Sequence, residues 1–202
     1  MKIISGKYKG RILKGYMIDG TRPTMDRVKE SVFAMIQDYI KDSIFLDLYS
    51  GSGNIGIEAI SNGSKKAYLV DNNMVAIKTI KENINMLKID NACVIKEDAI
   101  ACLNNFINTG IKFDIIFLDP PYDTEFSTYA KNEFTREDQK RLTTFLLHHC
   151  PAKWMMIIKN TDFIYQLYNK EGINIRTFDK EYLVSFMNRN DKIVTHLLIT
   201  NY

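Results

Sequence analysis

The sequence predicts an α/β fold: a mostly parallel, seven-stranded sheet with helices on both faces, a C-terminal antiparallel hairpin and a small basic N-terminal hairpin. From residue 44 onward, short apolar runs alternate with longer segments of helical periodicity, which is typical of a parallel sheet covered on both faces. Near the end of the chain this rhythm breaks, because two strand-like segments flank a short polar turn. Before it, the alternating character of residues 3–14 around Gly6 and Gly10 indicates a hairpin.

The individual elements follow from these patterns in chain order. After the N-terminal hairpin, apolar residues recur at helical spacing along one face of residues 25–41. Five apolar runs predict buried strands at 44–48, 66–70, 92–95, 113–118 and 154–158. Helical patterns occupy the intervals, at 54–62, 73–88, 98–107, 135–148 and 161–169. The terminal hairpin is expected to pair residues 182–187 with 193–200. We therefore expect two regions, a basic N-terminal extension and a single α/β domain, over residues 1–41 and 42–202.

The composition is that of an ordinary globular protein, with 202 residues, 46% hydrophobic and 25% charged. The N-terminus has no apolar signal-peptide core and no apolar run approaches the ~18 residues of a membrane span, so we expect no membrane association. The 3 cysteines are scattered without a Cys-x-x-Cys pair, and the 3 histidines show no metal-ligand spacing. This pattern predicts a cytoplasmic protein without a disulfide framework or a metal site.

Positive charge is concentrated at the N-terminus. Residues 1–30 hold 8 basic and 3 acidic side chains, a net charge of +5, so a total of +3 leaves −2 for the remaining residues. A basic end on a nearly neutral body predicts an anionic partner such as nucleic acid, although a solvated lysine-rich terminus would show the same asymmetry.

A glycine-rich loop follows the first expected strand. Residues 47–56, Asp-Leu-Tyr-Ser-Gly-Ser-Gly-Asn-Ile-Gly, place a G-x-G-x-x-G pattern between a strand and a helix, the context that a nucleotide-cofactor site requires. The second strand ends at Asp71, whose carboxylate can accept hydrogen bonds from both ribose hydroxyls of such a cofactor. Asp47 precedes the loop, where an acid is unhelpful to a pyrophosphate but suits a cationic or amino-bearing ligand, such as the methionine moiety of S-adenosylmethionine.

The acidic residues near this loop also have structural interpretations. Asp47 could instead brace the loop or cap a helix. Asp98, after the third strand, could accept a hydrogen bond from the adenine amino group or serve as an ordinary N-cap. Glu58, inside the helix after the loop, is expected to be a solvated helix residue.

The fourth strand ends in Asp119-Pro120-Pro121-Tyr122. Neither proline can extend a central strand, so the backbone there is stiff. Ligands of open parallel sheets bind outside the carboxyl ends of the strands, so we expect Asp119 to lie across a crevice from Asp47. The Asp119 carboxylate and the Pro120 carbonyl could accept both N–H groups of an exocyclic nucleobase amine, and Tyr122 could stack on the extruded base. The alternative is a rigid turn with a core tyrosine.

Through the glycine loop and residues 119–122, the chain resembles class I S-adenosylmethionine-dependent methyltransferases, which have a Rossmann-like fold. Within them the chain looks most like the bacterial small-subunit ribosomal RNA guanine-N2 methyltransferases (RsmD type). The resemblance covers roughly residues 1–122, and four stretches carry it: residues 3–11, 22–33, 46–59 and 117–122. The chain departs from the family at Asp71, where glutamate is usual, and after Tyr122, where the sequence looks closer to DNA adenine-N6 methyltransferases of the Dam type.

The resemblance implies a site for S-adenosylmethionine formed by Asp47, Tyr49, Gly51, Ser52, Gly53, Asp71, Asn72, Asp98 and Ala99. It also implies that residues 119–122 hold the acceptor base, and that the N-terminal cations Lys7, Lys9, Arg11, Arg22 and Arg27 approach ribosomal RNA or the small ribosomal subunit. The expected reaction is methyl transfer to guanine N2 in ribosomal RNA, with adenine N6 in DNA as the alternative. A nicotinamide-dependent oxidoreductase would leave Asp119 and Tyr122 unused, and a non-catalytic nucleic-acid-binding module would not need them.

Overall fold

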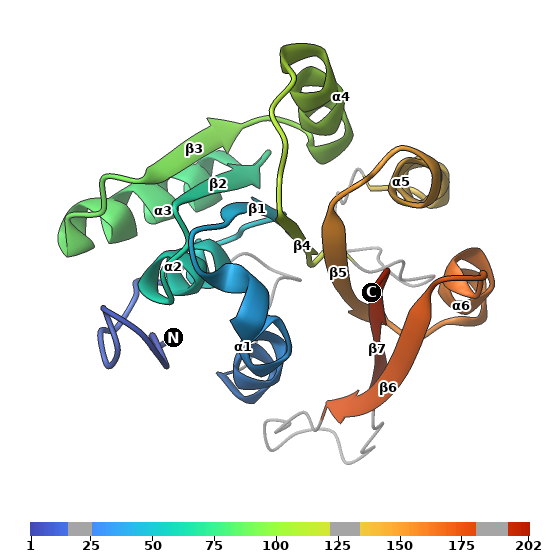
Figure 1. The fold of residues 1–202 in the computed structure, drawn as a ribbon, viewed down its shortest axis with the longest axis horizontal. Coiled ribbons are helices and arrows are strands. Elements are labelled where there is room, and N and C mark those ends of the chain that lie inside the picture. The colour runs from blue at the N-terminus through green and yellow to red at the C-terminus, as the bar shows by residue number, and fades with distance from the viewer. Residues whose placement is uncertain (16–25, 122–133, 181–193) are drawn as a thin grey trace, which may run out of the picture.

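The computed structural model describes residues 1–15, 26–121, 134–180 and 194–202. Its seven strands are β1 (Ile44–Leu48), β2 (Lys66–Asp71), β3 (Ala92–Lys96), β4 (Ile115–Leu118), β5 (Lys153–Lys159), β6 (Asn174–Lys180) and β7 (Val194–Thr200). The helices within the described residues are α1 (Asp26–Ile40), α2 (Asn54–Ser61), α3 (Met74–Leu87), α4 (Ala99–Thr109), α5 (Arg136–His148) and α6 (Asp162–Tyr168). The strands form one sheet in the order β3-β2-β1-β4-β5-β7-β6, in which β7 pairs antiparallel with both neighbours and all other pairs are parallel (Figure 1).

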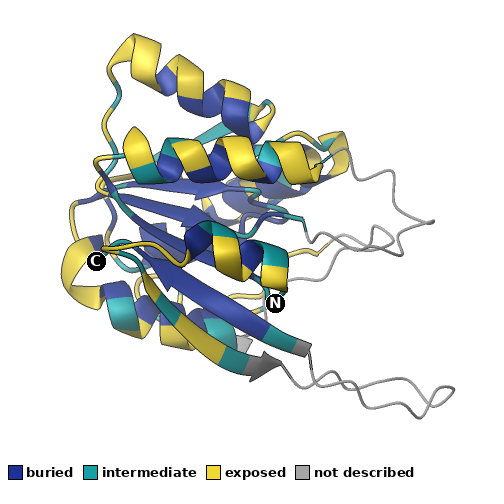
Figure 2. Ribbon diagram, turned by 90° about the vertical axis from the view of Figure 1, so that its right-hand side faces the viewer, coloured by how far each residue is buried: buried dark blue, intermediate teal, exposed yellow. Residues whose placement is uncertain are grey.

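The sheet is buried between two helical layers (Figure 2). Successive side chains of a strand point to opposite faces, so Phe45 packs with α1, α2 and α3, whereas Leu46 packs with α4, α5 and α6. Trp154 and Met155 divide in the same way, and both are almost fully buried, which confirms their expected place in the core. The predicted fold class is therefore confirmed.

The terminal antiparallel pair forms with a different first strand from the one expected. β6 occupies residues 174–180, whereas the predicted strand 182–187 and the turn after it lie outside the described residues. β6 is an edge strand whose residues are mostly exposed or half-buried, so it lacks the apolar run that reveals a central strand. The second strand of the pair, β7, agrees with the predicted 193–200.

The N-terminal hairpin is present and packs against the main domain. Lys2 and Ile12 form an antiparallel bridge, and the Ile3 N–H donates to the Arg11 carbonyl at 2.9 Å. Ile3 and Leu13 are 0% and 3% exposed and belong to the same hydrophobic cluster as α1, α2 and α3. The hairpin therefore contributes to the core of the domain while it presents charged side chains to solvent.

Candidate active site

Three acidic residues meet at the carboxyl ends of neighbouring strands. β1 lies between β2 and β4, and Leu48 pairs with Val70 on one side and with Leu118 on the other. Asp71 and Asp119 each occupy the next position beyond these pairs, and Asp47 lies one residue before Leu48. The chain steps outward from β1 to β3 and then returns to β4, so β1 and β4 flank the topological switch point where ligands of open α/β sheets bind.

Asp47 is 2% exposed, and its Oδ2 accepts a hydrogen bond from the Gly56 N–H at 2.8 Å. Burial, together with the smaller effect of the negative charges of Asp119 and Asp71, raises the pKa of Asp47 to about 8, against the opposing effect of the Gly56 N–H. The bracing role that the sequence left open is thus observed. The same environment would favour a cationic ligand, because added positive charge stabilises the ionised carboxylate.

Asp71 joins the end of β2 to the glycine loop. Its Oδ2 accepts from the Gly51 N–H at 2.9 Å, and its Oδ1 accepts from the Asn73 N–H at 2.8 Å. Burial raises the pKa of Asp71, and these N–H groups partly offset that increase. Binding of ribose hydroxyls by Asp71 remains a prediction.

The glycine loop has a backbone that only glycine adopts easily. Gly51 and Gly53 have φ values of 57° and 79°. A Cβ on Gly56 would lie 2.8 Å from Leu69 and 3.1 Å from the Asp47 carboxylate, so α2 packs directly on β1 and β2. The third glycine of the motif therefore serves close helix-strand packing.

Tyr49 lies between Asp47 and the glycine loop and also has a positive φ, of 63°. Its ring packs edge-on against Phe134 with centroids 5.5 Å apart. Its buried hydroxyl has no hydrogen-bond partner among the described residues, and burial raises the pKa of this phenol well above 10. An aromatic ring is thus held at the carboxyl ends of the strands.

The other predicted site residues lie around the same edge of the sheet. Asp98 is the N-cap of α4, where its Oδ1 accepts from the Ile100 and Ala101 N–H groups at 3.0 Å each, so the capping alternative is observed. Ala99 is buried at the start of α4, and Asn72 is exposed directly after β2. Pro120, which follows Asp119, is buried, Pro121 is half-buried, and Tyr122 lies outside the described residues.

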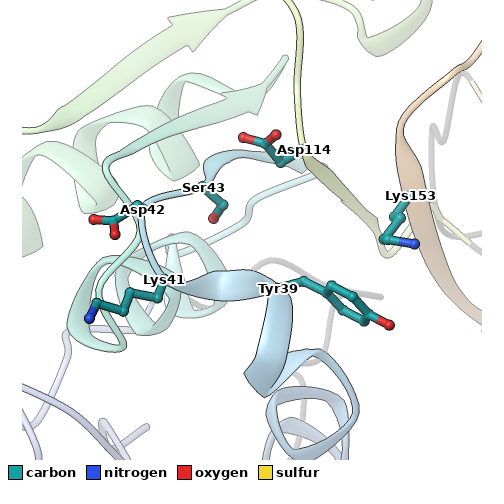
Figure 3. A pocket seen from close by; sticks show the side chains of 6 residues that line it. All are labelled: Tyr39, Lys41, Asp42, Ser43, Asp114 and Lys153. Atoms are coloured by element: carbon teal, nitrogen blue, oxygen red, sulfur yellow. The ribbon is translucent and has the colours of Figure 1, made fainter.

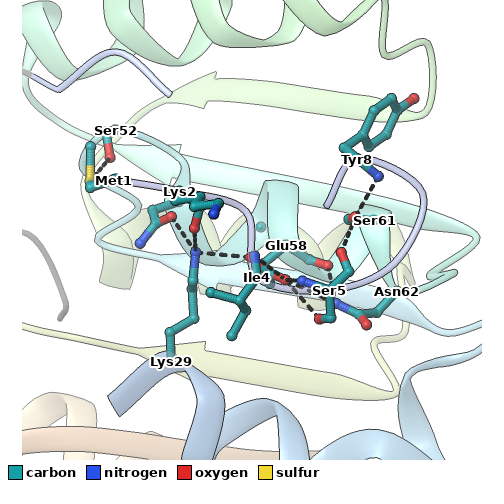
Figure 4. A network of polar contacts seen from close by, with 12 residues as sticks. Met1, Lys2, Ile4, Ser5, Tyr8, Lys29, Ser52, Glu58, Ser61 and Asn62 are labelled. Carbon is teal, nitrogen blue, oxygen red and sulfur yellow. Dashed lines mark hydrogen bonds and ion pairs between the residues drawn. The ribbon is translucent and has the colours of Figure 1, made fainter. Parts of the chain in front are cut away.

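Glu58 is not solvated, and the sequence-based expectation was wrong. It is 0% exposed and forms an ion pair with the equally buried Lys29, with Nζ and Oε2 2.8 Å apart (Figure 4). Its carboxylate also accepts from the Ile4 and Ser5 N–H groups. All residues of α2 are buried, because the sheet covers one side and the hairpin with α1 covers the other. Polar residues recur at helical spacing along one side of residues 54–61, so the sequence pattern indicated a solvent-facing side there.

The predicted nucleic-acid-binding residues are only partly described. Lys7, Lys9 and Arg11 are exposed on the hairpin. Arg27 falls in the first turn of α1, and Arg22 lies outside the described residues. Their contact with nucleic acid remains a prediction.

A hollow of about 260 Å³ lies at the opposite edge of the sheet (Figure 3). It is lined by Tyr39, Lys41, Asp42, Ser43, Asp114 and Lys153, which lie around the amino ends of β1, β4 and β5. Ligands of open parallel sheets bind at the carboxyl ends, so this hollow is not the candidate active site.

The residues at the carboxyl ends fit S-adenosylmethionine better than a dinucleotide. The carboxylates of Asp71 and Asp119 that lie near Asp47 would repel a pyrophosphate, whereas a sulfonium and an ammonium group would relieve the repulsion among the three acids. Among the described residues, no group of three or more His, Cys, Asp or Glu side chains could hold a metal ion. No described helix is long and apolar enough to cross a membrane.

Comparison with known proteins agrees with this assignment. Residues 1–162 match the family described as conserved hypothetical protein 95. The ribosomal RNA small subunit methyltransferase D of Haemophilus influenzae is 32% identical over 186 residues, which cover 83% of this chain and 93% of that protein. YlbH of Bacillus subtilis is 45% identical over 123 residues, or 60% of this chain and 67% of that protein. A solved Escherichia coli structure, yhhF, shares the fold, with a TM-score of 0.68, 23% identity and coverage of 99% and 97% of the two chains.

These matches extend the likeness past residue 122, beyond the region where the sequence motifs carried it. The chain therefore belongs to the family described as conserved hypothetical protein 95, and it is a class I S-adenosylmethionine-dependent methyltransferase of the RsmD type.

Proposed function

We propose that this enzyme methylates the exocyclic N2 of a guanine in ribosomal RNA, in the cytoplasm. The observation that carries the proposal is the position of Asp119 and the two prolines at the end of β4, beside Asp47 and the glycine loop. The names of the relatives support the choice of ribosomal RNA, since several are ribosomal RNA small subunit methyltransferases D.

The chemistry follows from the residues at this edge. Bound S-adenosylmethionine supplies an electrophilic methyl group. Asp47 and Asp71 would hold the cofactor, and the negative charge around Asp47 would attract the positively charged S-adenosylmethionine. The Asp119 carboxylate and the Pro120 carbonyl would accept the two N–H groups of the guanine amine, which frees the nitrogen lone pair from the ring and directs it at the methyl group. Tyr122 would stack on the extruded base.

The extension of residues 1–41 would bind the RNA for the domain of residues 42–202. Lys7, Lys9 and Arg11 expose positive charge on the hairpin, where they could contact phosphates before the base is extruded. Deletion of the hairpin would also remove Ile3 and Leu13 from the core, so charge reversal tests this role more cleanly. A Lys7→Glu/Lys9→Glu/Arg11→Glu variant should bind RNA more weakly and with a smaller salt dependence.

The matched control is Lys81→Glu/Lys112→Glu/Lys170→Glu, which reverses three exposed lysines outside the hairpin. Equal loss of RNA affinity in the two variants would contradict a specific role of the hairpin.

The acceptor is identified by the methylated product. Labelled S-adenosylmethionine is incubated in parallel with ribosomal RNA, assembled small subunits and duplex DNA, and the modified nucleoside is identified by mass spectrometry after digestion. N2-methylguanosine from RNA is the expected product. N6-methyldeoxyadenosine from DNA would overturn the proposal and show that the Dam-like C-terminal sequence indicates the substrate.

A further inference from the structure

One buried side chain connects the N-terminal hairpin to the glycine loop. Asn83 on α3 is 0% exposed, and its Oδ1 accepts from the Lys14 N–H at 2.8 Å. Its Nδ2 donates to the Lys14 carbonyl and to the Ser52 carbonyl, each at 3.0 Å. One amide group therefore uses its oxygen and its amino group to join the end of the hairpin to the middle of the loop.

The hairpin also holds the loop and the helix that follows it through other contacts (Figure 4). The Ser52 hydroxyl donates to the Met1 sulfur at 3.3 Å. At the far end of α2, the Lys7 N–H donates to the Ser61 carbonyl at 2.8 Å. A Cβ on Gly6 would lie only 1.8 Å from that carbonyl oxygen, so the hairpin backbone rests directly on the helix.

The opposite side of the loop is held by the carboxylates of the cofactor site. The Gly51 N–H donates to Asp71, and the Gly56 N–H donates to Asp47. Because Gly51 and Gly53 are conformationally permissive, the position of the loop depends on such contacts. Asn83 supplies a contact on the side of the hairpin, and a shift of Ser52 would move the adjacent glycines relative to Asp71 and Asp47.

We propose that Asn83 is a positioning residue for S-adenosylmethionine and that the N-terminal hairpin completes the cofactor site through it. Asn83 acts on the cofactor through the Ser52 backbone. The hairpin thus has a role in cofactor binding that is separate from any contact with nucleic acid.

The test is an Asn83→Ala variant, with Asn91→Ala as the matched control. The Asn91 amide also donates to two backbone carbonyls, of Ser64 and Lys65, but these lie at the amino end of β2, away from the glycine loop. Affinity for S-adenosylhomocysteine is measured by calorimetry at a temperature where circular dichroism shows each variant to be folded. We expect Asn83→Ala to bind about tenfold more weakly and Asn91→Ala to stay within about twofold of wild type.

Steady-state kinetics separates positioning from general destabilisation. Asn83→Ala should raise KM for S-adenosylmethionine while KM for the nucleic acid stays at the wild-type value. Wild-type affinity for S-adenosylhomocysteine in folded Asn83→Ala, or an equal loss in Asn91→Ala, would overturn the proposal. If Asn83→Ala does not fold, Asn83→Ser, which cannot span both partners, is judged by the same criteria. The binding measurement uses no nucleic acid, so it stands whichever acceptor the enzyme methylates.

Discussion

Glu58→Ala tests the buried ion pair of Glu58 and Lys29, where the sequence predicted a solvated glutamate. Glu58 and Lys29 are both 0% exposed, and the carboxylate also accepts from the Ile4 and Ser5 N–H groups. Truncation would leave the Lys29 ammonium buried with only the Lys2 carbonyl and the Asn54 amide oxygen as acceptors among the described residues. Removal of one partner from a buried pair costs about 3–5 kcal/mol of the free energy of unfolding. For a chain of 202 residues this corresponds to a fall in Tm of roughly 6–20 °C.

The free energy of unfolding is measured by urea titration followed by circular dichroism, and Tm is measured by thermal melting. Glu137→Ala is the control, because its pair with Lys140 is largely exposed and should contribute at most about 1 kcal/mol. A Lys29→Met/Glu58→Gln variant removes both charges but keeps an acceptor for Ile4 and Ser5, so it should regain most of the lost stability. A Glu58→Ala protein within about 1 kcal/mol of wild type would refute the reasoning and favour a solvated glutamate.

Three further outcomes follow from the carboxylates of the site. Asp71→Ala should weaken binding of S-adenosylmethionine and S-adenosylhomocysteine roughly ten- to a hundredfold in calorimetry, because hydrogen bonds to a charged group are lost; unchanged affinity would contradict its role. Asp119→Ala should nearly abolish methyl transfer from labelled cofactor, while the affinity of the variant for the cofactor stays at the wild-type value. Turnover of Asp119→Ala at the wild-type rate would show that Asp119 does not position the amine. Because the folded-state pKa of Asp47 is raised from 3.8 to about 8, protein stability should fall and S-adenosylmethionine affinity should rise as pH increases through that window. Stability and S-adenosylmethionine affinity are measured from pH 6 to 8, and both should lose this pH dependence in Asp47→Asn. A wild-type protein whose stability and affinity do not change with pH would contradict the raised pKa of Asp47.

Local patterns predicted most of the sheet. The predicted strands 44–48, 66–70 and 92–95 agree with β1, β2 and β3 to within one residue at each end, and the helices between them were expected in the same places. The agreement arises because a central strand is buried on both faces, so its own run of apolar residues predicts it. β6 was not found, since an edge strand with exposed polar residues carries no such run.

The sequence by itself determined which residues form the candidate site. The glycine loop, Asp71 and Asp119 each follow a strand, and the carboxyl ends of parallel strands share one edge of a sheet, so their proximity was predictable. Only the tertiary structure decided which residues Glu58 and Asn83 contact. Their partners Lys29, Lys14 and Ser52 lie 29 or more positions away in the chain. The periodicity of a helix shows which of its sides is apolar, but it does not show that a hairpin about 50 residues earlier in the chain will cover the remaining side.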